Sequence, residues 1–172
     1  MSQATSVVIG IDTGKKGAFA VVENGVVKSV HRMPNGLPVG AIARSAFRER
    51  LDTGGGRGVE IFYEKPNGFM GKTASYWAGF YEASCLAVPL ALVGGADIHC
   101  VMPKDWQREM FASVKGRKFG KGETKEAARA AITFFESRIE APYSIKHDGE
   151  VDAILIALYG WRMLYRGPEI AQ

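Results

Sequence analysis

Residues 7–12 read VVIGID, a run of β-branched residues that ends in a carboxylate, and this stretch decides the fold. A short apolar run of this kind predicts a buried strand. A second strand is predicted over residues 18–22, and the Asn24-Gly25 pair behind it is a strong signal for a hairpin turn into a third strand over residues 26–30. The chain is therefore expected to open with three antiparallel strands, with the carboxylate at the end of the first.

The rest of the chain alternates predicted strands and helices. Strands are expected over residues 59–63 and 98–101, and helices over residues 38–51, 73–88, 123–137 and 148–165, with one more helix beginning at Pro103. This order predicts a single α/β domain spanning residues 1–172, with a mixed five-stranded sheet flanked by helices.

Composition excludes several classes of protein. The 172 residues are 47% hydrophobic, which suits one packed domain and is too apolar for a disordered chain. No apolar stretch approaches the ~20 residues that span a bilayer, and no secretory signal is visible in residues 1–6. Cys85 and Cys100 cannot build a disulfide framework or a zinc knuckle, so both are expected to be reduced and buried. We expect a cytoplasmic protein of a bacterium or phage-infected cell, or the mature form of an organellar protein.

The net charge of +4, from 22 basic and 18 acidic residues, weakly favours a polyanionic partner.

Four carboxylates nevertheless interrupt apolar runs. Asp12 and Glu64 each end a predicted strand, and Asp148 and Asp152 are four positions apart on one face of the last helix. Carboxylates near a core are costly unless something compensates for them, and a hard divalent cation does so. Two Mg²⁺ ions ~4 Å apart activate a water and stabilise a leaving oxygen in phosphodiester hydrolysis.

Each acid also has a purely structural interpretation. Asp12 could start a turn, Asp148 is a plausible N-cap, and Glu64 could pair with a surface cation. Asp152 is harder to explain in this way because it lies within residues 151–157, where an apolar residue is expected. The four acids are therefore better explained together than separately.

The same positions resemble the RNase H-like nucleases. Residues 9–18, IGIDTGKKGA, are similar to the opening of that superfamily. Glu64 followed by FMGKTA at residues 69–74 resembles the second motif of RuvC-type Holliday junction resolvases, and HDGEVDAILIA at residues 147–157 resembles their last catalytic helix. The resemblance is strongest to the short resolvases of phages and organelles, including the plant chloroplast type.

This resemblance implies an RNase H-like fold and an endonuclease that depends on Mg²⁺ or Mn²⁺, with two ions per active site. It implies a homodimer that acts on four-way branched DNA and has no membrane partner. Asp12, Glu64 and Asp152 would be metal ligands. The fourth ligand stays open between Asp148, which we prefer, and His147, which could bind metal or transfer a proton near neutral pH.

DNA contacts are expected in two loops. Residues 115–122, KGRKFGKG, hold four basic residues and no acid, so they can follow a phosphate backbone, and Lys118 or Lys121 is a candidate to reach the scissile phosphate. In the family an apolar residue just past Glu64 wedges into the junction, although such a residue could also simply cover a helix end. The expected DNA-binding residues are Phe69, Met70, Lys72, Lys115, Arg117, Lys118, Lys121 and Lys125.

Rival functions come from other classes. Residues 68–73, GFMGKT, lie between a predicted strand and a helix as a phosphate-binding loop does, but the P-loop of an NTPase needs glycine where Pro66 stands. An ATPase of the actin or sugar-kinase type needs two such domains, and a junction-binding protein with a decayed site has no need of all four acids. Another RNase H-like nuclease, acting on RNA–DNA hybrids or flaps, is the alternative that the sequence separates least well.

Overall fold

The structure is a computed structural model that describes residues 7–12, 16–32, 59–65, 97–114 and 122–165. Within this part, one sheet contains β1 (Val7–Asp12), β2 (Ala18–Glu23), β3 (Val26–Arg32), β4 (Val59–Glu64) and β5 (Asp97–Val101), in the order β3-β2-β1-β4-β5. The first three strands are antiparallel, whereas β4 and β5 run parallel to β1. The antiparallel opening and the mixed five-stranded sheet are confirmed.

The turn between β2 and β3 has the predicted chemistry. Asn24 has φ of 49° and Gly25 has φ of 81°, so both central residues are in the left-handed region. A two-residue hairpin loop of this kind needs positive φ at both positions, which asparagine and glycine tolerate best. The Asn24-Gly25 turn therefore sets the pairing of Glu23 with Val26, and a bulge between Val21 and Val22 shifts the remaining pairs of β2 and β3 by one residue.

The described helices are α3 (Pro103–Ala112), α4 (Thr124–Phe134) and α5 (Asp148–Leu164), with a 3₁₀ turn over Glu136–Arg138. The prediction of one helix over residues 123–137 is wrong at its end, because the N–H of Arg138 bonds to the carbonyl of Phe135 in the tighter i to i+3 pattern. The helices predicted over residues 38–51 and 73–88 lie outside the described residues.

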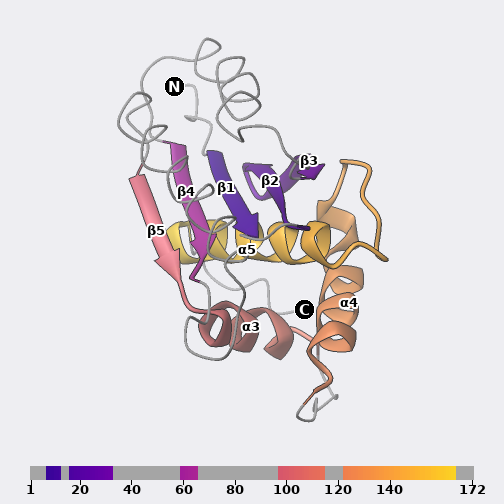
Figure 1. Cartoon of the computed structure of the whole chain (residues 1–172). Helices are drawn as coiled ribbons and strands as arrows, with labels where there is room; N and C mark the ends of the chain where they lie inside the picture. Colours follow the sequence, from indigo (N-terminus) through magenta and orange to yellow (C-terminus); the bar gives the residue numbers. More distant parts are fainter. Residues whose placement is uncertain (1–6, 13–15, 33–58, 66–96, 115–121, 166–172) are drawn as a thin grey trace.

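Helix α5 crosses one face of the sheet, and helices α3 and α4 pack against the side of α5 that faces away from the sheet (Figure 1). Burial on two sides explains why the helix is apolar nearly all round, with ten buried residues from Gly149 to Gly160. At the crossing, a Cβ added to Gly10 of β1 would lie 2.2 Å from the backbone nitrogen of Ala157 and 2.4 Å from the carbonyl oxygen of Ala153. Only glycine lets the strand and the helix backbone come this close.

The exposure of Cys100 differs from the expectation, and the described helices agree with the absence of an apolar stretch long enough to span a bilayer. Cys100 is exposed, so the expectation that it is buried is wrong. The reason is that β5 is the edge strand of the sheet, and an edge strand is less covered than a central one. Cys85 lies outside the described residues. Within the part of the chain that the structure describes, no helix is both long and apolar enough to cross a bilayer.

Candidate active site

Two of the predicted carboxylates lie at neighbouring strand ends. Asp12 is the last residue of β1 and Glu64 is the last of β4. The two strands are parallel neighbours, with Ile11 opposite Tyr63, so both acids emerge at the same edge of the sheet. Glu64 is held there by Trp106 of α3, whose Nε1 donates a hydrogen bond of 2.7 Å to Oε2.

The first turn of α5 meets this edge. A Cβ added to Gly149 would lie 3.0 Å from Oδ2 of Asp12 and 2.2 Å from the backbone oxygen of Lys16. Glycine at this position therefore lets the helix end approach the carboxylate directly. Asp148 and Asp152, on either side of Gly149 in the same turn, are brought to the acids of β1 and β4.

The electrostatics show that the four carboxylates share one environment. Burial, followed by the charges of Glu64 and Asp148, raises the pKa of Asp12 to about 7. Burial, followed by the charges of Asp12, Glu64 and Asp148, raises the pKa of Asp152 to about 8, against a partial opposing effect of Lys125. Like charges this close disfavour one another's ionised forms, which is the condition that a bound cation relieves.

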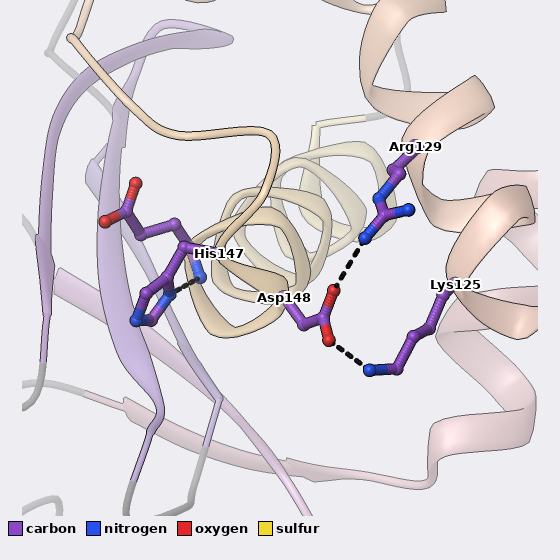
Figure 2. A network of polar contacts seen from close by, with 5 residues as sticks. Lys125, Arg129, His147 and Asp148 are labelled. Carbon is purple, nitrogen blue, oxygen red and sulfur yellow. Dashed lines mark hydrogen bonds and ion pairs between the residues drawn. The ribbon is translucent and has the colours of Figure 1, made fainter.

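Asp148 has cationic partners of its own. Lys125 and Arg129, one turn apart on α4, both form ion pairs with its carboxylate, the second at 3.4 Å (Figure 2). The hydrogen bond from Lys125 is the main cause that lowers the pKa of Asp148. Among the residues that the structure describes, no three His, Cys, Asp or Glu side chains gather closely enough to hold one ion. The four expected ligands therefore do not form a closed metal cluster in this structure, in which the carboxylate of Asp148 is paired with Lys125 and Arg129.

The donor set nevertheless fits the expected metal. All four candidates offer carboxylate oxygen, which is the donor that Mg²⁺ and Mn²⁺ prefer. Asp12 and Asp152 are the members with the most strongly raised pKa values, so they gain most from a nearby positive charge. These two acids would hold the ions, with Glu64 and Asp148 completing the set.

His147 caps α5, so the structural interpretation of Asp148 as an N-cap does not account for its presence. Nδ1 of His147 accepts a hydrogen bond of 3.2 Å from the backbone N–H of Glu150, whereas Asp148 is already the first helical residue. Because Nδ1 accepts, the ring proton is on Nε2, and neither nitrogen offers a lone pair to a metal. This arrangement favours Asp148 over His147 as the fourth ligand.

Sequence patterns did not indicate Glu150 as a site residue. Its side chain is buried, with 5% exposed surface, and it accepts hydrogen bonds from Arg32 of β3 and from the backbone N–H of Ser144. Acids are common in the first turn of a helix because they interact favourably with the helix dipole, so nothing in the sequence indicated that Glu150 is buried. The expected DNA-binding residues other than Lys125 lie outside the described part: Phe69, Met70, Lys72, Lys115, Arg117, Lys118 and Lys121.

The sheet order and the helix across it define an RNase H-like fold, as expected. The chain is similar to Thermus thermophilus RuvC in complex with a Holliday junction substrate, with 15% identity, a TM-score of 0.56, and 93% of this chain and 96% of that one covered. A second T. thermophilus RuvC structure matches with 17% identity, a TM-score of 0.54 and coverage of 92% and 96%. The yeast mitochondrial Holliday junction resolvase Ydc2 matches with 14% identity, a TM-score of 0.55 and coverage of 96% and 84%.

No family model matches the chain, and no curated protein matches it by sequence. The likeness to these resolvases therefore lies in the fold.

The raised pKa values predict how stability depends on pH. The folded protein holds protons on Asp12 up to about pH 7 and on Asp152 up to about pH 8, whereas the unfolded chain releases them near 3.8. The unfolded state therefore binds fewer protons between these limits, so the free energy of unfolding falls as the pH rises from about 4 to about 8. Thermal unfolding in EDTA should show a lower midpoint at about pH 8.5 than at about pH 5.5.

Added Mn²⁺ should reverse part of this loss, since it competes with the same protons. Its stabilising effect is expected to be larger at the higher pH. The double variant Asp12→Asn plus Asp152→Asn should flatten the pH dependence in EDTA. A midpoint that rises with pH over this range in the unaltered protein would contradict the shared carboxylate environment.

Proposed function

We propose that the protein is a structure-specific DNA endonuclease that resolves four-way junctions by metal-dependent hydrolysis of phosphodiester bonds. The observation that carries this proposal is the placement of Asp12 and Glu64 at neighbouring strand ends of an RNase H-like sheet, with Asp148 and Asp152 on the helix that meets them, where burial and like charges raise the pKa values of Asp12 and Asp152. A site built from carboxylates alone suits two Mg²⁺ or Mn²⁺ ions. Further support comes from the fold, which resembles that of a RuvC bound to a Holliday junction.

The chain's own residues would divide the work. Asp12 and Asp152, whose pKa values are raised by burial and by the neighbouring acids, would hold the ions. Trp106 would orient Glu64, and Asp148 would bind after release from its ion pairs. When bound, the two ions would activate a water and stabilise the leaving oxygen. The family resemblance implies in-line attack that leaves 5′-phosphate and 3′-hydroxyl ends, which a ligase can rejoin.

Basic residues would position the DNA. The side chain of Lys125 is 71% exposed and that of Arg129 is 46% exposed, and both lie on α4 beside the carboxylates. A phosphate arriving there would take the place of the Asp148 carboxylate as their partner. The loop over residues 115–122 would extend this contact, with Lys118 or Lys121 nearest the scissile phosphate, and Phe69 with Met70 would open the junction centre.

A homodimer follows from the symmetry of the substrate. Two opposed strands of a four-way junction are related by a two-fold axis, and two identical sites on a two-fold dimer match it. The type we propose is the short resolvase of phages and organelles, on the resemblance of residues 69–74 and 147–157 to the motifs of that family.

The loop contact has a quantitative test. Each phosphate contact contributes about 0.9 to the slope of log affinity against log salt concentration. The double variant Lys118→Ala plus Lys121→Ala should therefore bind a four-way junction more weakly and reduce that slope by about 2. The matched control is Lys104→Ala plus Arg108→Ala, which removes two exposed cations from α3. Equal slopes for the two double variants would rule out the loop as a DNA contact.

The function is tested by offering the purified protein a four-way DNA junction, a linear duplex of the same sequence, a flap and an RNA–DNA hybrid, each with Mg²⁺ or with EDTA. We expect the junction to be cut preferentially, and only with Mg²⁺. Preferential cutting of the hybrid or the flap would instead identify another type of RNase H-like nuclease. Cutting in EDTA would contradict the metal-dependent mechanism.

A further inference from the structure

A row of residues across three strands links Asp12 to the start of α5. The strand register places Asp12 opposite Ala18 of β2, and Ala18 opposite Arg32 of β3. Nε of Arg32 then donates to Oε1 of Glu150, in the first turn of α5. One row of the sheet therefore has a candidate metal ligand, Asp12, at one end and Arg32 at the other. We call the Arg32–Glu150 ion pair, which holds the start of α5, the clamp.

Glu150 is unusual for its burial. Only 5% of its surface is exposed, and its second oxygen accepts the backbone N–H of Ser144 at 2.6 Å, so the clamp also fixes the connection that leads into α5. A buried carboxylate is costly to desolvate, and a well-packed apolar residue of similar volume is often at least as stabilising. Packing alone therefore gives no reason for a carboxylate at this position.

The clamp controls the placement of two candidate ligands. Asp148 is two residues before Glu150 and Asp152 is two residues after it, all within the first turns of one helix. A rotation or slide of this helix end moves both acids relative to Asp12. A metal site tolerates displacements of only about 0.5 Å, so an element that holds the helix end is a condition for binding.

We propose that Glu150 is a positioning residue of the metal site: together with Arg32, it holds the first turn of α5 on the Asp12 row so that Asp148 and Asp152 reach ion-binding geometry. The inference rests on the proposed function only in that these carboxylates bind divalent ions. It makes Glu150 neither a ligand nor a group that touches the DNA.

Mn²⁺ binding to the DNA-free protein, measured by titration calorimetry, tests the inference. Glu150→Ala removes both clamp bonds, whereas Glu150→Gln keeps the size of the side chain and an acceptor for Ser144. Loss of a group that orients metal ligands typically costs 10- to 100-fold in affinity. We expect that loss for Glu150→Ala and a smaller one for Glu150→Gln. For junction cleavage, kcat should fall more in Glu150→Ala than in Glu150→Gln, while KM for the junction is unchanged in both variants.

The control is Lys28→Ala, which breaks another ion pair between β3 and the segment before α5, the one with Glu140. Its Mn²⁺ affinity should equal that of the unaltered protein. If Glu150→Ala does not fold, Arg32→Ala replaces it, because the Arg32 side chain is 58% exposed and its removal leaves no cavity in the core. We expect Arg32→Ala to lose several-fold in Mn²⁺ affinity.

Two results would overturn the inference. One is a folded Glu150→Ala or Arg32→Ala that binds Mn²⁺ as the unaltered protein does. The other is an equal change in kcat and KM, which indicates a general structural role. If the unaltered protein binds Mn²⁺ but does not cut junctions, the proposed substrate is wrong while the positioning role stands. If it binds no Mn²⁺, the metal site and the positioning role both fail.

Discussion

Asp12→Asn should abolish cleavage while four-way junctions are still bound. Asparagine has the same size and keeps one oxygen, so the strand end is preserved, but it brings no negative charge to a cation. Metal ions at such sites supply several kcal/mol of transition-state stabilisation, so we expect kcat to fall by about 10³-fold or more. Single-turnover cleavage and junction binding in Ca²⁺ measure the two properties separately.

The same change should stabilise the metal-free protein at high pH. Asp12 has a pKa raised to about 7 by burial and by its acidic neighbours, so its ionised form is unfavourable in the folded state. Asp12→Asn removes that charge, and its thermal midpoint in EDTA at about pH 8.5 should exceed that of the unaltered protein. The control Asp105→Asn, on the surface of α3, should affect neither property. Cleavage that survives Asp12→Asn would show that the metal assignment is wrong.

Gly10→Val should strongly destabilise the described core. Even a Cβ at this position would lie 2.2 Å from a backbone nitrogen of α5 and 2.7 Å from the Cα of Ala157, and backbone atoms cannot turn away as a side chain can. Overpacking of this kind costs up to about 3 kcal/mol, or more where the backbone must shift. Urea denaturation should show that loss in the free energy of unfolding.

Gly10→Val should also impair the site, because β1 carries Asp12 and α5 carries Asp152, and the clash drives the two elements apart. Mn²⁺ affinity of the folded fraction is therefore expected to fall together with stability. The control Ser29→Val places the same side chain on the edge strand β3 and should cost far less. Equal costs for the two variants would contradict the close crossing of β1 and α5.

The elements that sequence patterns predicted best are those with a strong local signal. The Asn24-Gly25 turn and the β-branched run of β1 each depend on residues that are adjacent in the chain. The placement of Asp12 and Glu64 at the ends of neighbouring strands was also predictable, because the end of a strand is a local feature. The roles of the acids as ligands remain predictions.

Features that depend on tertiary partners were not predictable in the same way. Asp148 is of a residue type that favours the N-cap, whereas His147 occupies that position, and the choice between them depends on how the preceding segment enters the helix. The ion pairs that draw Asp148 toward α4 and the burial of Glu150 join segments that are far apart in sequence. The exposure of Cys100 follows from the position of β5 at the edge of the sheet, which no local pattern encodes.

The proposed function requires two identical carboxylate sites that cut opposed strands of a four-way DNA junction. The direct measurement uses one junction labelled at the 5′ end of each strand in turn, incubated with the protein and Mg²⁺, and then treated with ligase. We expect cuts at symmetric positions in two opposed strands, in products that the ligase seals. Cuts confined to one strand, or a protein that leaves the junction intact and degrades the RNA strand of a hybrid, would contradict it.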